Sequence, residues 1–101
     1  APAEVEAVLA GHEAVAEAVV VGVPSELSDE DVKAWLLLAP GTTLDIDDLH
    51  RHAAEQLARF KVPRYYEVVD ELPLTPTGRV AKHQLPTDRR PSEVDMEERR
   101  G

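Results

Sequence analysis

Cysteine is absent from this chain of 101 residues, so neither a disulfide nor thiol chemistry is possible. This composition is compatible with a reducing cytoplasm, and we expect a cytoplasmic protein. Aromatic residues are scarce as well, at 4% of the sequence, so aliphatic side chains must supply most of the hydrophobic core. The length allows one small domain built around such a core.

Long apolar stretches are also missing. No run approaches the roughly 20 residues that a membrane-spanning helix needs, and the N-terminus has no signal-like pattern. We therefore expect a soluble protein without a membrane span.

Basic residues are almost missing from the first half of the chain. Residues 1–50 hold eleven acids and a single base, Lys33, whereas residues 51–85 hold six bases against four acids, within a net charge of −9. An acidic protein is a poor nucleic-acid binder, because neutralising phosphates needs a basic face. The bases between Arg59 and Lys82 mark the place where an anionic small molecule would bind.

Two kinds of catalytic grouping are not found either. The four histidines show no metal-ligand spacing, and His50 and His52 lie two apart, hence on different faces of a helix. No Ser-His-Asp arrangement is indicated, and we expect no metal site.

Hydrophobic periodicity predicts a small α+β domain over residues 1–85. We expect a sheet of about three strands with two helices packed on one face, plus a short C-terminal element. The predicted helices are 2–10 and a second one that Asp45 caps and that ends near Phe60. The predicted strands are 15–23, 32–38 and 65–69, and the final element is 80–84. Residues 86–101 have almost no apolar content, which indicates a charged, disordered tail or a helix that forms only against something else.

Residues 72–85 form the most informative segment, LPLTPTGRVAKHQL. Pro73 and Pro76 stiffen its backbone, and Gly78 can adopt a positive φ. The turn delivers two cations, Arg79 and Lys82. A stiff exposed loop that presents a cation suits anion chemistry completed by a partner surface, whereas the alternative is an ordinary connector with solvated bases.

Further segments in order and spacing carry a family resemblance. They are PAEVEAVLAGHEAV (2–15), EAVVVGVP (17–24), DEDVKAWLLL (29–38), RFKVP (59–63), YEVVDELP (66–73) and TPTGRV (75–80). From Pro2 to about Leu85 the set resembles the small C-terminal domain of AMP-forming acyl-CoA synthetases, the acyl-adenylate ligase superfamily. Within it, the chain is most similar to ligases of the carnitine or medium-chain type. The resemblance implies a fragment of a larger ligase, inactive by itself, whose partner is the N-terminal domain of the same protein.

The resemblance also implies a reaction. A carboxylic acid is joined to the α-phosphate of ATP, with Mg²⁺, and the acyl group is then transferred to CoA; none of these ligands is expected on the isolated domain. A loop cation between the carboxylate and the phosphate would stabilise the first transition state. In the family this cation is a lysine directly after Thr-Gly, and here the position is Arg79, which keeps the charge but is longer and planar.

This departure leaves three alternatives. Arg79 acts with altered geometry, Lys82 replaces it, or the parent keeps only the thioester-forming half of the reaction. Lys61 and Arg64 are the residues that the resemblance places near CoA, and Thr77 and Gly78 those near phosphate, although the threonine hydroxyls could instead close the turn. Two rival interpretations remain, namely the same subdomain from an adenylation domain that loads a carrier protein and a binding module without chemistry.

Overall fold

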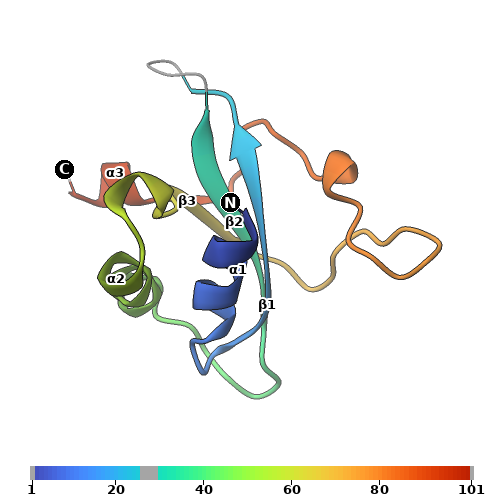
Figure 1. Ribbon diagram of the computed structural model, residues 1–101, viewed down its shortest axis with the longest axis horizontal. Coiled ribbons are helices and arrows are strands. Elements are labelled where there is room, and N and C mark those ends of the chain that lie inside the picture. Colours follow the sequence, from blue (N-terminus) through green and yellow to red (C-terminus); the bar gives the residue numbers. More distant parts are fainter. Residues whose placement is uncertain (1, 26–29, 101) are drawn as a thin grey trace.

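The sheet of this domain has four strands, and the computed structural model describes residues 2–25 and 30–100 of the chain. Figure 1 shows helices on one side of the sheet and a long excursion of the chain on the other. The strands, in spatial order, are β1 (Val15–Val23), β2 (Asp31–Leu38), β3 (Tyr65–Val68) and β4 (Val94–Asp95). The α-helices are α1 (Pro2–Ala10), α2 (Ile46–Gln56) and α3 (Met96–Arg100), and the 3-10 turns are η1 (Arg59–Lys61) and η2 (Lys82–Gln84).

The sheet is mixed. Strands β1 and β2 form an antiparallel pair, β2 and β3 run parallel, and β4 is antiparallel to β3. The parallel pair needs a crossover, which α2 and η1 provide. The expected α+β fold is confirmed, with one strand more than predicted.

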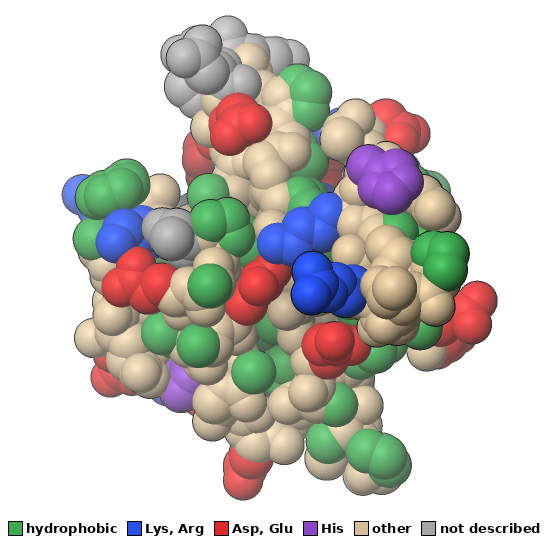
Figure 2. Space-filling model, turned by 45° about the vertical axis from the view of Figure 1, so that its right-hand side comes forward, with side chains coloured by type: hydrophobic (Ala, Val, Ile, Leu, Met, Phe, Trp, Pro, Cys, Tyr) green, Lys and Arg blue, Asp and Glu red, His purple; other side chains and the backbone are tan. Residues whose placement is uncertain are grey.

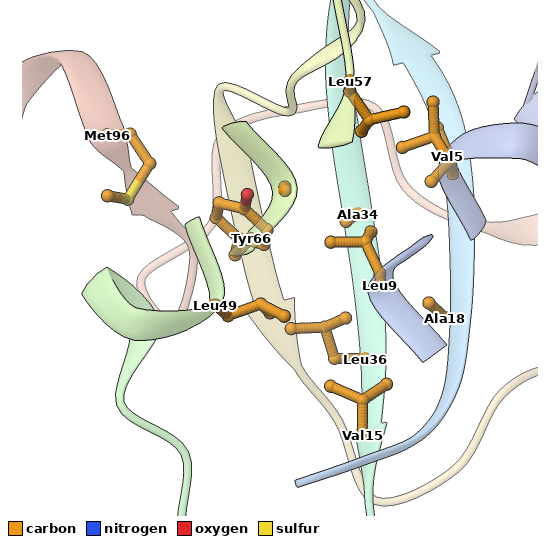
Figure 3. Packing of buried hydrophobic residues seen from close by; sticks show 12 residues of the cluster. Val5, Leu9, Val15, Ala18, Ala34, Leu36, Leu49, Leu57, Tyr66 and Met96 are labelled. Atoms are coloured by element: carbon orange, nitrogen blue, oxygen red, sulfur yellow. The ribbon is translucent and has the colours of Figure 1, made fainter. Parts of the chain in front are cut away.

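Both long helices pack on the same face of the sheet. Val5 and Leu9 of α1 and Leu49 of α2 meet Leu36 and Tyr66, all of them buried (Figure 3). The helical spacing of these residues gives each helix one apolar stripe, and β-branched residues fill β1. This layer confirms the helix packing that periodicity predicts.

The second helix begins where the sequence predicts and ends earlier. The Asp45 side chain accepts hydrogen bonds from the backbone N–H groups of Asp47 and Asp48, which caps α2. The helix ends at Gln56 rather than near Phe60, because Leu57 is already extended and η1 follows as a separate turn. The predicted helix end was inferred from Pro63, but the chain leaves the helical conformation several residues before this proline.

The opposite face of the sheet is covered by irregular chain. Val19 of β1 and Trp35 of β2 pack there against Leu72 and Leu85, which flank the loop that the sequence singles out. The loop is thus mounted on a second, smaller core.

The C-terminal segment differs from the disordered tail that composition indicates. Within it, β4 pairs with β3, and the Met96 side chain belongs to the main hydrophobic core. Arg90 and Ser92 donate hydrogen bonds to the buried carboxylate of Glu67. Charged contacts therefore order a segment that has little apolar surface.

Across the described ranges, none of the helices has the length and apolar character to cross a bilayer.

Candidate functional site

The loop at residues 74–80 is a short β-hairpin. Leu74 and Val80 form an antiparallel bridge, and the Thr75 N–H donates to the Arg79 carbonyl at 2.7 Å. Below them, the Ala81 N–H donates to the Pro73 carbonyl at 2.8 Å. In Figure 1 the hairpin projects from the body on the side away from α2. The predicted stiff, exposed loop is therefore held by its own backbone hydrogen bonds.

Gly78 and two threonines close the tip of the hairpin. The Gly78 N–H donates to the Thr75 carbonyl at 2.9 Å, and Gly78 has a φ of +86°, a conformation that favours glycine. The Thr75 hydroxyl accepts from the Arg79 N–H at 3.2 Å and lies 3.1 Å from the Thr77 hydroxyl. The hydroxyls thus serve the turn, and a contact of Thr77 with phosphate stays a prediction.

Arg79 is the exposed cation of this tip. Within residues 2–25 and 30–98, its guanidinium makes no ion pair, although the domain is rich in acids. Leu74 on the facing side of the hairpin is 60% exposed. The tip therefore presents an unpaired positive charge beside an apolar side chain.

Lys82, three residues after Arg79, has an ion-pair partner on the body of the domain. Its Nζ lies 2.9 Å from Oε2 of Glu6 on α1. The same Glu6 oxygen accepts a hydrogen bond of 2.8 Å from the backbone N–H of Val20. Figure 2 shows this side of the molecule, where basic and acidic side chains lie next to one another. Lys82 is thus paired with the body of the domain, whereas the Arg79 guanidinium has no ion pair within residues 2–25 and 30–98.

The turn η1 carries a second group of predicted site residues. Lys61 Nζ lies 2.7 Å from Oε1 of Glu4, and its hydrogen bond holds the pKa of that carboxyl below its ordinary range. Phe60, beside it, is 80% exposed. Because the Glu4 side chain is half exposed, this ion pair is weak and an incoming phosphate could replace it.

Arg64 follows η1 and is more firmly held. Its Nε and Nη2 donate to the two oxygens of Asp95, each at 3.0 Å, and Nη1 donates to Asp31 at 3.0 Å. Burial alone would raise the pKa of Asp95, but the Arg64 hydrogen bonds outweigh it and hold the pKa low. Arg64 also lines a cavity of about 360 Å³ together with His50, Ala54, Leu57, Arg59, Val62, Pro63, Met96 and Glu97. Its first role in the isolated domain is to tie β4 to the sheet.

The predicted site residues fall into two groups rather than one. Thr77, Gly78 and Arg79 lie on the hairpin. Lys61 lies in η1, and Arg64 lies between η1 and β3, away from the hairpin (Figure 1). Within the described part of the chain, no group of three His, Cys, Asp or Glu side chains could hold a metal ion. The two groups lie apart, and completion of either by another protein surface stays a prediction.

Sequence reasoning missed Glu6. An acid in the first turn of a helix is explained well enough by the helix dipole, so its pattern gives no further signal. Its partner Lys82 lies 76 positions later in the chain, which only the tertiary structure reveals.

Comparison with protein families identifies the family of this chain. Residues 4–79 match the AMP-binding enzyme C-terminal domain. Over 84 residues the chain is 48% identical to the fatty acid–acyl-carrier-protein ligase ScoC of Streptomyces coeruleorubidus, covering 83% of this chain and 16% of that protein. It is 43% identical to a long-chain-fatty-acid–CoA ligase of Bacillus subtilis, with 83% and 15% covered. The crotonobetaine/carnitine–CoA ligase of Salmonella arizonae is 37% identical, with 81% and 16% covered.

Solved structures agree with these relatives. The chain resembles an acyl-CoA synthetase of Brucella canis with a TM-score of 0.76 and 41% identity, covering 81% of this chain and 16% of that one. It resembles o-succinylbenzoate CoA synthetase of Bacillus subtilis, in complex with its acyl-adenylate intermediate, with a TM-score of 0.81 and 35% identity, covering 92% and 19%. This chain therefore spans less than a fifth of the proteins that it resembles.

Proposed function

The chain belongs to the family of AMP-binding enzyme C-terminal domains, and we propose that it is the mobile C-terminal subdomain, residues 1–85, of an AMP-forming acyl-CoA ligase. The parent would activate a carboxylic acid with ATP and pass the acyl group to CoA in the cytoplasm. Because the chain spans 16% of its relatives, the ATP and acyl pockets would belong to an N-terminal domain, its proposed partner.

The observation that carries the proposal is the exposed, unpaired Arg79 at the tip of a stiff hairpin. In the first half-reaction, a carboxylate oxygen attacks the α-phosphorus of ATP and the bond to pyrophosphate breaks. Negative charge builds up on the α-phosphoryl oxygens, and a cation placed between the two reacting anions stabilises that state more than the separate reactants. The pyrophosphate leaves with the electron pair, and Mg²⁺ would accompany the phosphates.

The second half-reaction would use the other group of residues. The thiolate of CoA attacks the acyl carbonyl carbon, and AMP leaves as a phosphate anion. We place Lys61 and Arg64 beside the CoA phosphates after the domain rotates. Lys61 is suited to this role because its pair with Glu4 is exposed, whereas Arg64 would keep Asp95 and offer the Nη1 side that contacts Asp31.

The test is pyrophosphate exchange by the parent ligase with a panel of carboxylic acids. Replacing Arg79 with alanine is expected to lower exchange about 100- to 1000-fold, the typical effect of removing one positioned charge donor. Arg79→Lys is expected to raise exchange above wild type, since it restores the family's ammonium. Arg51→Ala removes another exposed base, one paired with Asp48 on α2, and is expected to change nothing. Equal exchange in wild type and Arg79→Ala would refute the role of the hairpin.

One relative favours a second candidate function. The similarity to a fatty acid–acyl-carrier-protein ligase suggests that the acceptor thiol belongs to a carrier protein. Supplying the parent and its acyl-adenylate with either CoA or a phosphopantetheinylated carrier would decide between them. Absence of turnover with every acid and both acceptors would instead favour a binding module without chemistry.

A further inference from the structure

The carboxylate of Glu6 joins three separate parts of the fold. It projects from α1, accepts a hydrogen bond of 2.8 Å from the Val20 N–H of β1, and lies 2.9 Å from Lys82 Nζ. Strand β1 is at the edge of the sheet, where outward N–H groups have no neighbouring strand. Glu6 therefore accepts a hydrogen bond from an N–H group of the edge strand β1 and places a negative charge beside that strand.

That point lies at the neck of the hairpin. Ala81 is 1% exposed and makes the last backbone hydrogen bond between the hairpin's two arms. Lys82 follows directly and opens η2, whereas Thr77, Gly78 and Arg79 at the tip are exposed. The neck is thus fixed by the burial of Ala81 and by the ion pair of Lys82 with Glu6.

We infer that Glu6 is a positioning residue for Arg79, and that it acts through Lys82 to set the direction in which the hairpin points. The inference rests on the proposed function, because delivery of a cation to a phosphate requires a fixed direction. A displacement of about 1 Å at a reacting centre can cost on the order of 100-fold in rate. In this arrangement Lys82 does not replace Arg79 as the catalytic cation, because the Lys82 ammonium pairs with Glu6 and holds the neck of the hairpin.

Glu4 provides a matched control on the same helix. Its carboxylate also pairs with a lysine, Lys61, at 2.7 Å, and this pair does not touch the hairpin. Both ion pairs are partly exposed, so neither contributes much to global stability. A change in hairpin direction can therefore be measured separately from unfolding.

The first experiment uses the 101-residue chain and needs no activity. Backbone ¹⁵N relaxation is measured for residues 74–81 in wild type, Glu6→Gln and Glu4→Gln. Order parameters of the tip are expected to fall from about 0.85 toward 0.6 in Glu6→Gln and to stay unchanged in Glu4→Gln. Unchanged tip dynamics in Glu6→Gln, or the same loss in both variants, would overturn the inference.

The second experiment separates the half-reactions of the parent ligase. Glu6→Gln is expected to lower kcat of pyrophosphate exchange about 10- to 100-fold with little change in KM for ATP, and to leave thioester formation from supplied acyl-adenylate unchanged. Glu6→Lys removes the acceptor of the Val20 N–H and leaves two lysines facing each other; adding Lys82→Glu to that variant is expected to recover part of its loss, which a purely structural defect would not show. Equal losses in both half-reactions would overturn the inference. A wild-type ligase without exchange would count against the proposed function instead, and the relaxation experiment would then decide the inference alone.

Discussion

Replacing Lys33 with methionine is expected to destabilise the domain by about 3–5 kcal/mol, the usual cost of breaking a buried ion pair from one side. The Lys33 side chain is fully buried on β2. Its Nζ lies 2.9 Å from Oε1 of Glu67, 2.6 Å from Oε1 of Glu93, and 4.0 Å from the centre of the Trp35 ring. The substitution keeps an apolar chain of similar length and removes the charge.

The remaining contacts place the expected loss near the lower end of that range. Glu67 would keep hydrogen bonds from Arg90 and Ser92, and Glu93 would keep its bond from Arg89. We therefore expect a loss of about 3 kcal/mol, since neither carboxylate is left without a donor. For a domain of about 100 residues, this corresponds to a fall of about 12–24 °C in Tm.

Urea unfolding followed by far-UV circular dichroism measures this loss directly. Lys61→Met is the control, because it breaks a partly exposed pair and should leave the free energy of unfolding nearly unchanged. The double variant Lys33→Met with Glu67→Met should recover part of the stability, since apolar replacement of a whole buried pair is often tolerated. A Lys33→Met variant as stable as the Lys61→Met control would refute the reasoning.

Two other predictions concern the same network. Truncation after Pro86 removes β4 and the buried Met96, so Tm measured by circular dichroism should fall at least as far as in Lys33→Met; an unchanged Tm would show that the segment is dispensable. Burial would raise the pKa of Glu67, but hydrogen bonds from Lys33, Ser92 and Arg90 hold it below its ordinary 4.5, so its contribution is complete above that pH and is lost as pH falls through the lowered value. The urea concentration at the unfolding midpoint should therefore decrease once the pH is lowered below about 4.5. This decrease should be smaller in Glu67→Gln than in wild type, and identical pH profiles of the two proteins would contradict this assignment.

Local patterns were sufficient to predict most of the secondary structure. The β-branched run of β1 and the helical spacing of α1 each have one dominant interpretation, because the burial of a single face requires that period. The helix cap at Asp45 was equally readable, since the side chain satisfies donors two and three residues away.

The C-terminal segment could not be predicted in this way. Its apolar content is low, and its attachment depends on Arg90 and Glu93 meeting Glu67 and Lys33 on strands far back in the chain. Lys33 itself lies in an apolar strand, two residues before Trp35, and both side chains lie on the second face of the sheet. Composition indicates how much apolar surface a segment can bury. The C-terminal segment is instead attached by charged side chains, whose partners come together only in the folded sheet.

The candidate site shows the same limit. The proline, threonine and glycine residues predict the turn of the hairpin, because each of them restricts or extends the backbone conformations available locally. The sequence offers Arg79 at the position after Thr-Gly and Lys82 as a substitute for it, and in the structure the two differ in that Lys82 pairs with Glu6. A role that depends on the absence of a partner cannot be read from neighbours in the sequence.

The unpaired charge of Arg79 is not explained by a shortage of acids, because the chain has 20 acidic residues against 11 lysines and arginines. Lys61, Lys82 and Arg64, all within the same stretch of sequence, have carboxylate partners within 3.0 Å. The hairpin keeps Arg79 away from such partners, since its backbone bonds hold the tip clear of the body. An exposed cation that stands clear of the acidic surface of the domain keeps its charge available to an approaching anion. The unpaired guanidinium is therefore the feature of this domain that agrees best with the proposed delivery of a cation to a phosphate bound elsewhere in the parent protein.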